Sequence, residues 1–477
     1  MPPMRPLESA PSVAWRTLAL TSVAVFVVSL DGTVLFVAFP SIRATFADVS
    51  PAQLSWVLNA YTIVFGSLLV PAGRIADRIG RKRSFLTGLS LFTIASALCG
   101  LAPGAAWLIA ARALQAVGAA FLLPSSLALV LHAFPATRRA TAVSVWGAVG
   151  ALAAAIGPSL GSLIVQYASW RWAFYLNVPI GLFAVLRGSR TLLESRDERA
   201  GDLPDPIGIA LLVASVALIA LGIVEGRGWG LVDPRTAASF GGGALLFIGF
   251  VLRSRRAASP AVDLSLFADR NYRLANLATF FFAVAFIAMF FTFVFFLTLR
   301  WHYSLFQAGL AITPGPLTVI PVAIAAGRIA DRRGHRGVVV AGGLVFALGG
   351  ALFYSGLDSP PDFLTTWLPR AVVTGVGVGL VLPSLSGAAV HGLLPAELAL
   401  GSAINQAVRQ IGSVIGVGLV IALVGRADAS GELDGFVRIA QILVGGGVLT
   451  SLIALGLRTG PQHRTVSIEA KKETASA

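Results

Sequence analysis

Charged residues are scarce in this chain of 477 residues. Asp, Glu, Lys and Arg make up 12% of it, hydrophobic residues make up 56%, and the mean hydropathy is +0.81. A soluble protein of this length needs far more charge to cover the surface of its two or three domains. The scarcity excludes an ordinary soluble protein and indicates a chain that lies mostly in a membrane.

Residue types that build common active sites are also rare. The single cysteine, Cys99, excludes a disulfide within the chain. The five histidines are widely spaced, so no metal site is indicated, and none of the three lysines follows a glycine as an ATP-binding P-loop requires. We therefore expect neither an enzyme nor a bound cofactor. The net charge of +14 lies in short segments between apolar runs, which favours membrane loops over nucleic-acid binding.

Apolar runs of about 20 residues, long enough to span a membrane, recur along the whole chain. The first covers residues 17–40 and is too long for a secretory signal peptide, so we expect it to be retained. Gly, Pro and charged residues separate fourteen expected helices, which begin near residues 15, 52, 83, 105, 140, 171, 206, 235, 272, 305, 337, 364, 400 and 436.

The distribution of basic residues orients the chain. An even number of spans places both termini on one side. Of the 36 Lys and Arg residues, 26 then fall on the terminal side, 7 on the opposite side and 3 within spans. The positive-inside rule makes the terminal side cytoplasmic. The excess of arginine over lysine is typical of a GC-rich bacterial gene, so we expect a bacterial plasma (inner) membrane.

One charged segment occurs twice. "GRIADRIGRKR" begins at Gly73 and "GRIADRRGHRG" begins at Gly327, with seven of eleven positions identical. The first copy follows expected helix 2 and the second follows expected helix 10. A second repeat relates "RALQAVGAAFLLPSSL" from Arg112 to "RAVVTGVGVGLVLPSLS" from Arg370 at nearly the same offset. Parallel repeats of this kind occur in transporters whose binding site lies between the repeats.

The repeats predict an all-α integral membrane protein with two six-helix bundles and two inserted helices. Each copy of the charged segment then follows the second helix of its bundle. The expected divisions are 1–200 for the first bundle, 201–258 for the inserted pair, 259–460 for the second bundle and 461–477 for a cytoplasmic tail.

Several motifs resemble those of the major facilitator superfamily. The repeated charged segment resembles the signature loop of that family. The resemblance narrows to its fourteen-helix drug:proton antiporters of the EmrB/QacA type through "LDGTVLFVAFP" from Leu30, "RALQAVGAA" from Arg112, "GPSLG" from Gly157 and "WRWAFYLNVPIG" from Trp170. It covers essentially the whole chain and implies proton-driven export of lipophilic compounds.

Asp31 is the one acidic residue deep inside an expected span, where a carboxylate costs about 2.5 to 3.5 kcal/mol on insertion scales. Arg112 lies at a similar depth, and Gln115 is one turn away on the same helix face. Together with Asn59 of helix 2, these residues could line one polar cavity. The alternative is that Asp31 and Arg112 only neutralise each other. In the transporters that the chain resembles, the equivalent acid and arginine couple proton and substrate.

Two positions depart from the pattern of that family. Phe36 stands where an asparagine is usual, which replaces a polar substrate contact with an aromatic one. Gly157, Pro158 and Gly161 match the antiporter motif in helix 5, whereas Ser162 replaces a usual glycine. Small residues permit close helix contact and the proline frees a carbonyl group. The motif therefore indicates either an exchange function or ordinary helix packing.

The repeated loops carry groups suited to gating. Gly73 permits a tight helix contact, and Arg81 holds its loop in the cytoplasm through the positive-inside rule. Topology does not explain why the aspartate is repeated. We expect a cytoplasmic latch between the bundles, made by the charged pair of each copy: Asp77, Arg78, Asp331 and Arg332.

Expected helix 13 carries Asn405 and Arg409 on one face. Arg409 lies about 12 Å from the cytoplasmic end of this helix. Both residues are candidates for the substrate cavity, although Arg409 could instead satisfy a helix end.

The leading hypothesis is a proton-coupled antiporter that exports lipophilic or cationic drugs by alternating access. A dedicated exporter of one endogenous metabolite or natural product would use the same scaffold. A membrane sensor without transport is disfavoured because the tails are short and carry no evident signalling domain. The expected partners are a small lipophilic substrate, protons and the lipid bilayer, and the sequence identifies no adaptor protein.

Overall fold

The computed structural model describes residues 11–196, 202–230, 232–394, 397–424 and 432–459, and every regular element within them is helical. The chain begins with α1 (Pro11–Thr45), α2 (Pro51–Ile79), α3 (Arg81–Gly100), α4 (Ala105–Ala133), α5 (Ala136–Tyr167), α6 (Trp170–Tyr175) and α7 (Asn177–Thr191). It continues with α8 (Pro206–Trp229), α9 (Pro234–Arg256), the 3-10 helix η1 (Leu264–Ala268), α10 (Arg270–Phe295), the π-helix η2 (Phe296–Arg300) and α11 (Leu305–Ile312). It ends with α12 (Pro314–Arg333), α13 (His335–Ser355), the π-helix η3 (Phe363–Trp367), α14 (Leu368–Val390), α15 (Leu398–Val424) and α16 (Glu432–Ala454).

Thirteen helices in the described residues are long and apolar enough to cross a membrane. Every expected helix start lies close to an observed one. The sixth expected span starts where predicted, but it is interrupted at Leu176 between α6 and α7. Pro179 lies in the first turn of α7 and cannot donate to the carbonyl of Tyr175, so the two pieces do not join into one regular helix.

Turn residues set several helix boundaries. Ser50 Oγ accepts a hydrogen bond from Gln53 N at 3.1 Å, and Pro51 occupies the first position of α2. Gly80 separates α2 from α3 with a φ of 116°, and Gly334 separates α12 from α13 with a φ of 82°. These positive φ angles favour glycine, so each copy of the repeated segment contains the same kind of turn between two helices.

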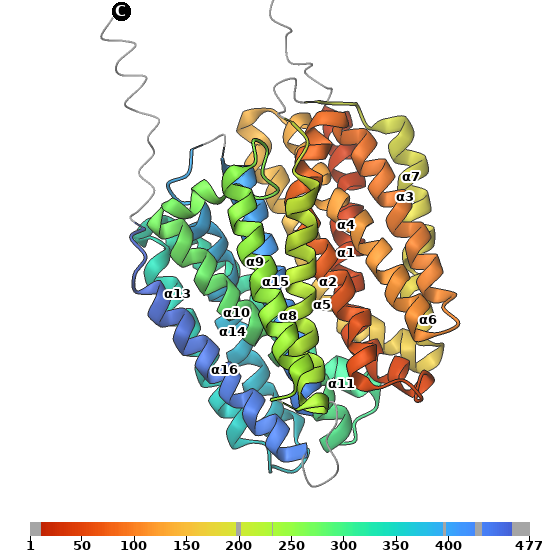
Figure 1. Cartoon of the computed structure of the whole chain (residues 1–477), viewed down its shortest axis with the longest axis vertical. Coiled ribbons are helices and arrows are strands. Elements are labelled where there is room, and N and C mark those ends of the chain that lie inside the picture. Colours follow the sequence, from red (N-terminus) through yellow and green to blue (C-terminus); the bar gives the residue numbers. More distant parts are fainter. Residues whose placement is uncertain (1–10, 197–201, 231, 395–396, 425–431, 460–477) are drawn as a thin grey trace, which may run out of the picture.

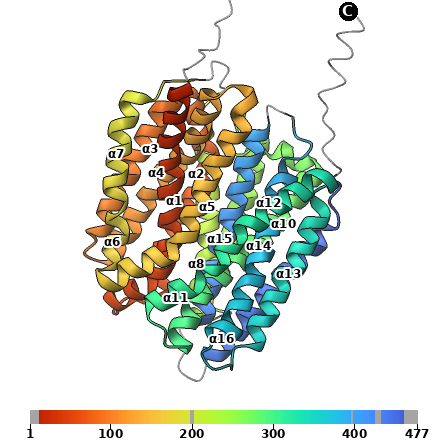
Figure 2. The same cartoon turned by 180° about the vertical axis from the view of Figure 1, so that it is seen from behind.

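The helices form two groups that lie side by side (Figures 1 and 2). In the first group, α1 packs against α5, and α4 packs against α2 and α3. In the second, α13 packs against α14 and α16, and α10 packs against α15. The groups meet through α2 and α15, α5 and α11, and α1 and α10, while α8 contacts both α2 and α15. The mid-span side chains of α1, α2, α10 and α15 are thereby brought to the seam between the groups.

Polar contacts between α5 and the second group lie at one end of the molecule, at the bottom of Figure 1, where α11 is found. Phe306 N donates to Gln166 Oε1 at 3.0 Å, and the hydroxyls of Ser159 and Thr313 share a hydrogen bond. Helix α1 begins at the other end. There Arg74 donates to Pro260 O at 2.6 Å, which ties α2 to the segment after α9.

Candidate functional site

The centre of the first helix group contains a buried ion pair. Arg112 Nη1 of α4 lies 2.6 Å from Asp31 Oδ2 of α1. Asp31 is 3% exposed and Arg112 is 1% exposed. Sequence depth suggested this contact, and the structure contains it. A buried pair of this kind is held by geometry and by further hydrogen bonds, because burial of the charges alone is unfavourable.

Two amides complete the surroundings of the pair. Gln115 Nε2 donates to Asp31 Oδ1 at 3.0 Å, and Asn177 Nδ2 donates to the same oxygen at 3.2 Å. Arg112 Nη1 also donates to Gln115 Oε1 at 2.6 Å. The Asp31 carboxylate therefore accepts hydrogen bonds from three side chains and donates none of them. This is the bonding pattern of an ionised carboxylate.

Asn177 was missed by sequence reasoning. It is 1% exposed and is the first residue of α7. Its Nδ2 also lies 3.1 Å from Ser96 Oγ of α3. It reaches Asp31 from the first turn of α7, immediately after the break at Leu176. Pro179 was the available signal for that break, since proline disfavours a continuous helix before it.

Helices α2 and α6 enclose the guanidinium of Arg112. Its Nε donates to Val57 O at 3.3 Å, and its Cζ lies 4.0 Å from the centroid of the Tyr61 ring. The Phe174 ring lies 5.7 Å away. Aromatic faces attract a cation, so these rings help to retain the charge inside the group.

Asn59 does not join this network, although we expected four residues to line one cavity. It is buried and donates only to Ser55 Oγ, at 3.5 Å. The physical reason is its position on α2. Tyr61 faces Arg112, and Asn59 is two residues away, or about 200° around the helix. Gln115 does contact the ion pair and is sealed there, at 0% exposure.

Phe36 links the two helix groups. Its ring centroid lies 5.6 Å from that of Phe290 and 5.5 Å from that of Phe291, both on α10. The aromatic residue at this departure from the family pattern therefore packs across the seam.

The small residues of the helix 5 motif bring α5 close to two neighbours. A Cβ on Gly161 would lie 2.9 Å from Val34 Cγ1 of α1, and one on Gly157 would collide with the Thr33 side chain. On another side of α5, a Cβ on Gly309 of α11 would lie 2.6 Å from Pro158 O. The close contact expected from the sequence is present, and it joins α5 to α11 of the second group.

Within the part of the chain that the structure describes, no ion pair joins the two copies of the repeated segment. Asp77 pairs with Arg81 of its own loop at 2.8 Å, and within the described residues Asp331 has no ion-pair partner. The expected latch between the bundles is therefore absent from this conformation. Among the described residues, neither of its arginines, Arg78 and Arg332, pairs with an aspartate of the other bundle. The physical reason is that α5 meets α11 at the opposite end of the molecule. Gly73 does make a tight contact, since a Cβ there would lie 3.3 Å from the Pro124 Cβ of α4.

A returning segment caps the helix that begins within each copy. In the first group, Glu194 Oε1 accepts from Lys82 N at 3.0 Å and Oε2 accepts from Arg83 N at 3.2 Å. In the second group, Thr459 Oγ1 accepts from His335 N at 2.9 Å and from Arg336 N at 3.1 Å. The sequence analysis did not identify either cap.

Helix α15 carries the remaining candidates. Asn405 is buried and its Nδ2 lies 3.1 Å from Asn276 Oδ1 and 3.0 Å from Thr279 Oγ1, both on α10. Arg409 is partly exposed and donates to Gln406 Oε1. It lies mid-helix and does not satisfy a helix end.

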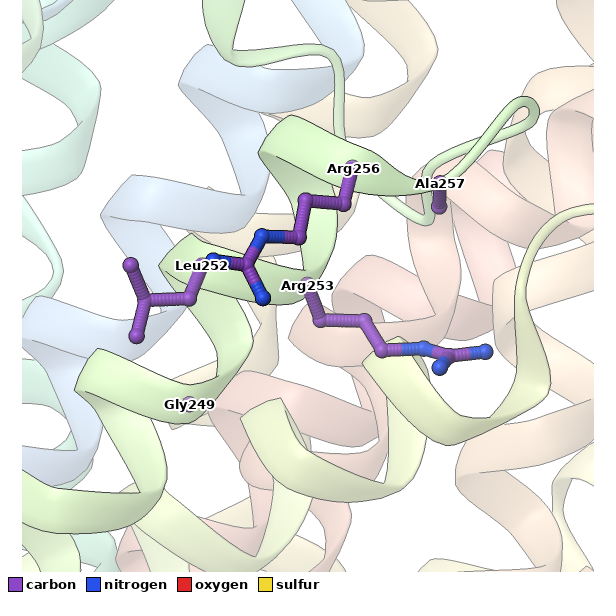
Figure 3. A pocket seen from close by; sticks show the side chains of 5 residues that line it. All are labelled: Gly249, Leu252, Arg253, Arg256 and Ala257. Atoms are coloured by element: carbon purple, nitrogen blue, oxygen red, sulfur yellow. The ribbon is translucent and has the colours of Figure 1, made fainter.

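A separate pocket lies at the end of α9, and Figure 3 shows the side chains that line it: Gly249, Leu252, Arg253, Arg256 and Ala257. Arg253 donates to both carboxylate oxygens of Asp205, at 2.7 and 3.1 Å, and holds the pKa of Asp205 below its ordinary value. The pocket contains no residue of the Asp31 network. The ion pair of Asp205 and Arg253 joins the start of α8 to the end of α9.

The described residues contain no cluster of three or more His, Cys, Asp or Glu side chains that could hold a metal ion. The site is therefore characterised by one sealed ion pair and by contacts across the seam.

Comparison with known proteins identifies the family. The model of the Major Facilitator Superfamily matches residues 21–417. The chain is 33% identical to the cephamycin export protein CmcT of Amycolatopsis lactamdurans, over 95% of each chain. It is 32% identical to the puromycin resistance protein pur8 of Streptomyces alboniger, over 97% of this chain and 94% of that one.

A solved structure supports the fold. The crystal structure of a bacterial homologue of the human lysosomal transporter Spinster, in an inward-facing and unoccupied conformation, matches with a TM-score of 0.65. The match covers 94% of this chain and 98% of that one at 14% identity. The matched family model, the exporters it resembles and the many apolar helices agree: the chain is a multi-pass membrane transporter that belongs to the Major Facilitator Superfamily.

Proposed function

We propose that the protein is a proton-coupled antiporter that exports antibiotics or other toxic amphipathic compounds across the plasma membrane. The observation that carries this proposal is the buried pair of Asp31 and Arg112, because an ionisable group inside a membrane span is costly and is functional by default. The names of the relatives, which include export and resistance proteins for cephamycin and puromycin, support a drug as the cargo.

Asp31 would be the proton site. In the present arrangement its carboxylate accepts from Arg112, Gln115 and Asn177. A proton can bind when Arg112 withdraws, and it leaves when Arg112 returns. Each proton that moves inward gains about 2.3 kcal/mol per 100 mV of membrane potential, in addition to the pH gradient. No cofactor is needed, because this gradient is the energy source.

Alternating access would occur between the two helix groups. The contacts of α5 with α11 close the end opposite the start of α1, which fits an inward-facing state. In the outward-facing state the other end would close, and the latch of Asp77, Arg78, Asp331 and Arg332 would form. Gly157, Pro158 and Gly161 would be the contact that loosens as the groups rock.

The topology belongs to the same proposal. With the broken α6 and α7 pair counted as one more crossing, the thirteen candidate spans would become fourteen, and the positive-inside rule would then put both termini in the cytoplasm of a bacterial cell. The first bundle covers 1–200, the inserted helices 201–258, the second bundle 259–460 and the tail 461–477. Helix α8 lies at the seam and contacts both groups, as expected for an insert that connects them.

A dedicated exporter is the second candidate. Several relatives are named for one compound, namely cephamycin, puromycin and lincomycin. A susceptibility panel in cells that express the chain separates the two candidates. Protection against one compound indicates a dedicated exporter, and protection against several chemical classes indicates a multidrug exporter.

The central test is Asp31→Asn in proteoliposomes, with a compound that the panel shows to be exported. We expect loss of pH-gradient-driven accumulation but retained downhill exchange, because substrate can still bind and the groups can still move. Asp48→Asn is the matched control, since Asp48 is exposed in the turn after α1. Full accumulation by the Asp31→Asn variant would contradict the proposed coupling.

A further inference from the structure

Arg409 is a second arginine in the middle of a membrane span. It lies eleven residues after Leu398, the first residue of α15, which is about 16 Å along the helix. That is half of a hydrocarbon core of about 30 Å. A cation at this depth is costly and requires a partner.

The structure provides no acidic partner for this charge. Within the described residues Arg409 has no ion pair, and its guanidinium donates only to Gln406 Oε1. The hydroxyl of Ser413 donates to the main-chain oxygen of Arg409 and so does not reach the guanidinium. Arg112, the buried arginine of the first group, has the carboxylate of Asp31 instead.

The contacts of α15 show where Arg409 points. Asn405 bonds to α10, and a Cβ on Gly412 would lie 2.6 Å from Phe280 O of the same helix. On the other side, Gln410 packs against Gly66 of α2. At about 100° per residue around the helix axis, Arg409 lies about 40° from Asn405 and Gln410 lies about 140° from it. Arg409 is therefore between these two residues on the helix surface.

Arg409 therefore faces the space between α10 and α2, which belong to different helix groups. Helix α1 packs against both of these helices, so this face is turned towards the middle of the molecule and away from lipid. Arg409 is partly exposed there, unlike the sealed Arg112. A partly exposed guanidinium without an acidic partner at the seam is placed to meet a transported molecule.

We propose that Arg409 binds an anionic group of the exported compound, such as a carboxylate. The inference rests on the proposed function and narrows its substrate class to amphipathic anions. A guanidinium presents a planar set of donors that matches a carboxylate, and Gln406 occupies and orients only one nitrogen. The aromatic contact of Phe36 with Phe290 provides an apolar surface at the same seam. A cationic drug would be repelled by Arg409, so this proposal favours anionic over cationic cargo.

Three dansyl probes test this inference in proteoliposomes that contain the full chain. They share one ring system and one alkyl linker, and they end in a carboxylate, a methyl ester or an ammonium group. We expect the wild-type protein to export the carboxylate probe fastest. Arg409→Gln should lower export of that probe roughly tenfold, the effect of losing one charge-assisted hydrogen bond, and leave the ester unchanged.

Two further variants control for folding and for charge. Arg409→Lys keeps the positive charge and should retain part of the carboxylate export. Arg235→Gln makes the same chemical change at an exposed position at the start of α9 and should match the wild type. The preference of the wild-type protein among the probes requires no variant, so it decides the question even if Arg409→Gln fails to fold.

Each outcome has a defined meaning. Equal or faster wild-type export of the ester or ammonium probe overturns the anion site. Undiminished carboxylate export by Arg409→Gln does so as well. If the wild-type protein exports none of the probes and protects cells against no compound of the panel, the proposed function itself fails, and this inference fails with it.

Discussion

At mid-span the first helix group holds its polar residues together with charge, whereas the second uses neutral groups. Asp31 and Arg112 form an ion pair at 2.6 Å. In the second group, Asn405 bonds to Asn276 and Thr279. Only the first arrangement contains an acid that can take up a proton. Under the proposed function, proton coupling would belong to the first group, and Arg409 would give the second a different role.

The repeated loops differ in the same direction. Asp77 finds Arg81 four residues later, whereas the residue four positions after Asp331 is His335. The capping residue is an acid, Glu194, in the first group and a hydroxyl in the second. The repeated segment is thus stabilised by charged side chains in the first group and by neutral hydrogen bonds in the second.

The largest effect should come from breaking the central ion pair. Arg112→Gln leaves the Asp31 carboxylate buried without a counter-charge, which should cost about 3–5 kcal/mol of stability and abolish uphill transport. The double variant Asp31→Asn with Arg112→Gln should be more stable than Arg112→Gln alone, because no charge remains buried. Asn405→Ala in the second group should cost only about 1 kcal/mol.

Thermal unfolding of the purified proteins in detergent measures these differences, and equal expression with correct membrane insertion is the control. If the double variant unfolds at the same temperature as Arg112→Gln, the unpaired carboxylate is not the cause of the instability.

An intermediate effect is expected at the repeated aspartates. Asp77→Asn should lower efflux roughly fivefold or more, the lower range of typical coupling energies, because it removes both the pair with Arg81 and the latch of the outward-facing state. Asp331→Asn should lower efflux less, since it removes only the latch. Topology should be unchanged in both, because the basic residues determine it. Wild-type efflux from equally expressed Asp77→Asn protein would exclude the latch.

The smallest effect is expected at the two helix caps, and the ionic strength distinguishes the charged cap from the neutral one. Glu194→Gln and Thr459→Ala should each lower stability by about 1 kcal/mol, as typical losses of a helix cap do. The Glu194→Gln effect should shrink at high salt because it removes a charge, whereas the Thr459→Ala effect should persist. Melting temperatures at low and high ionic strength test this. The comparison fails if both variants respond to salt equally.

Sequence predicted the parts of the fold that depend on hydrophobic length and punctuation. The span positions and the contact of Asp31 with Arg112 follow from depth along a helix. Asn59 was assigned to the same cluster because depth says nothing about direction around a helix, and the packing of Tyr61 decides that direction. The sequence could not show in which conformation the latch would form, because the same sequence adopts every conformation of a transport cycle.

Cys99 offers a consequence of a different kind. It is the single thiol in 477 residues, it is buried, and its Sγ donates to Gln115 Oε1 at 3.7 Å, one contact away from the ion pair. A maleimide can reach it only when the first helix group opens, because an enclosed thiol does not react. The native sequence therefore carries its own label site for the coupling centre. The rate at which a fluorescent maleimide attaches to unmodified protein measures how often the first helix group opens around that centre.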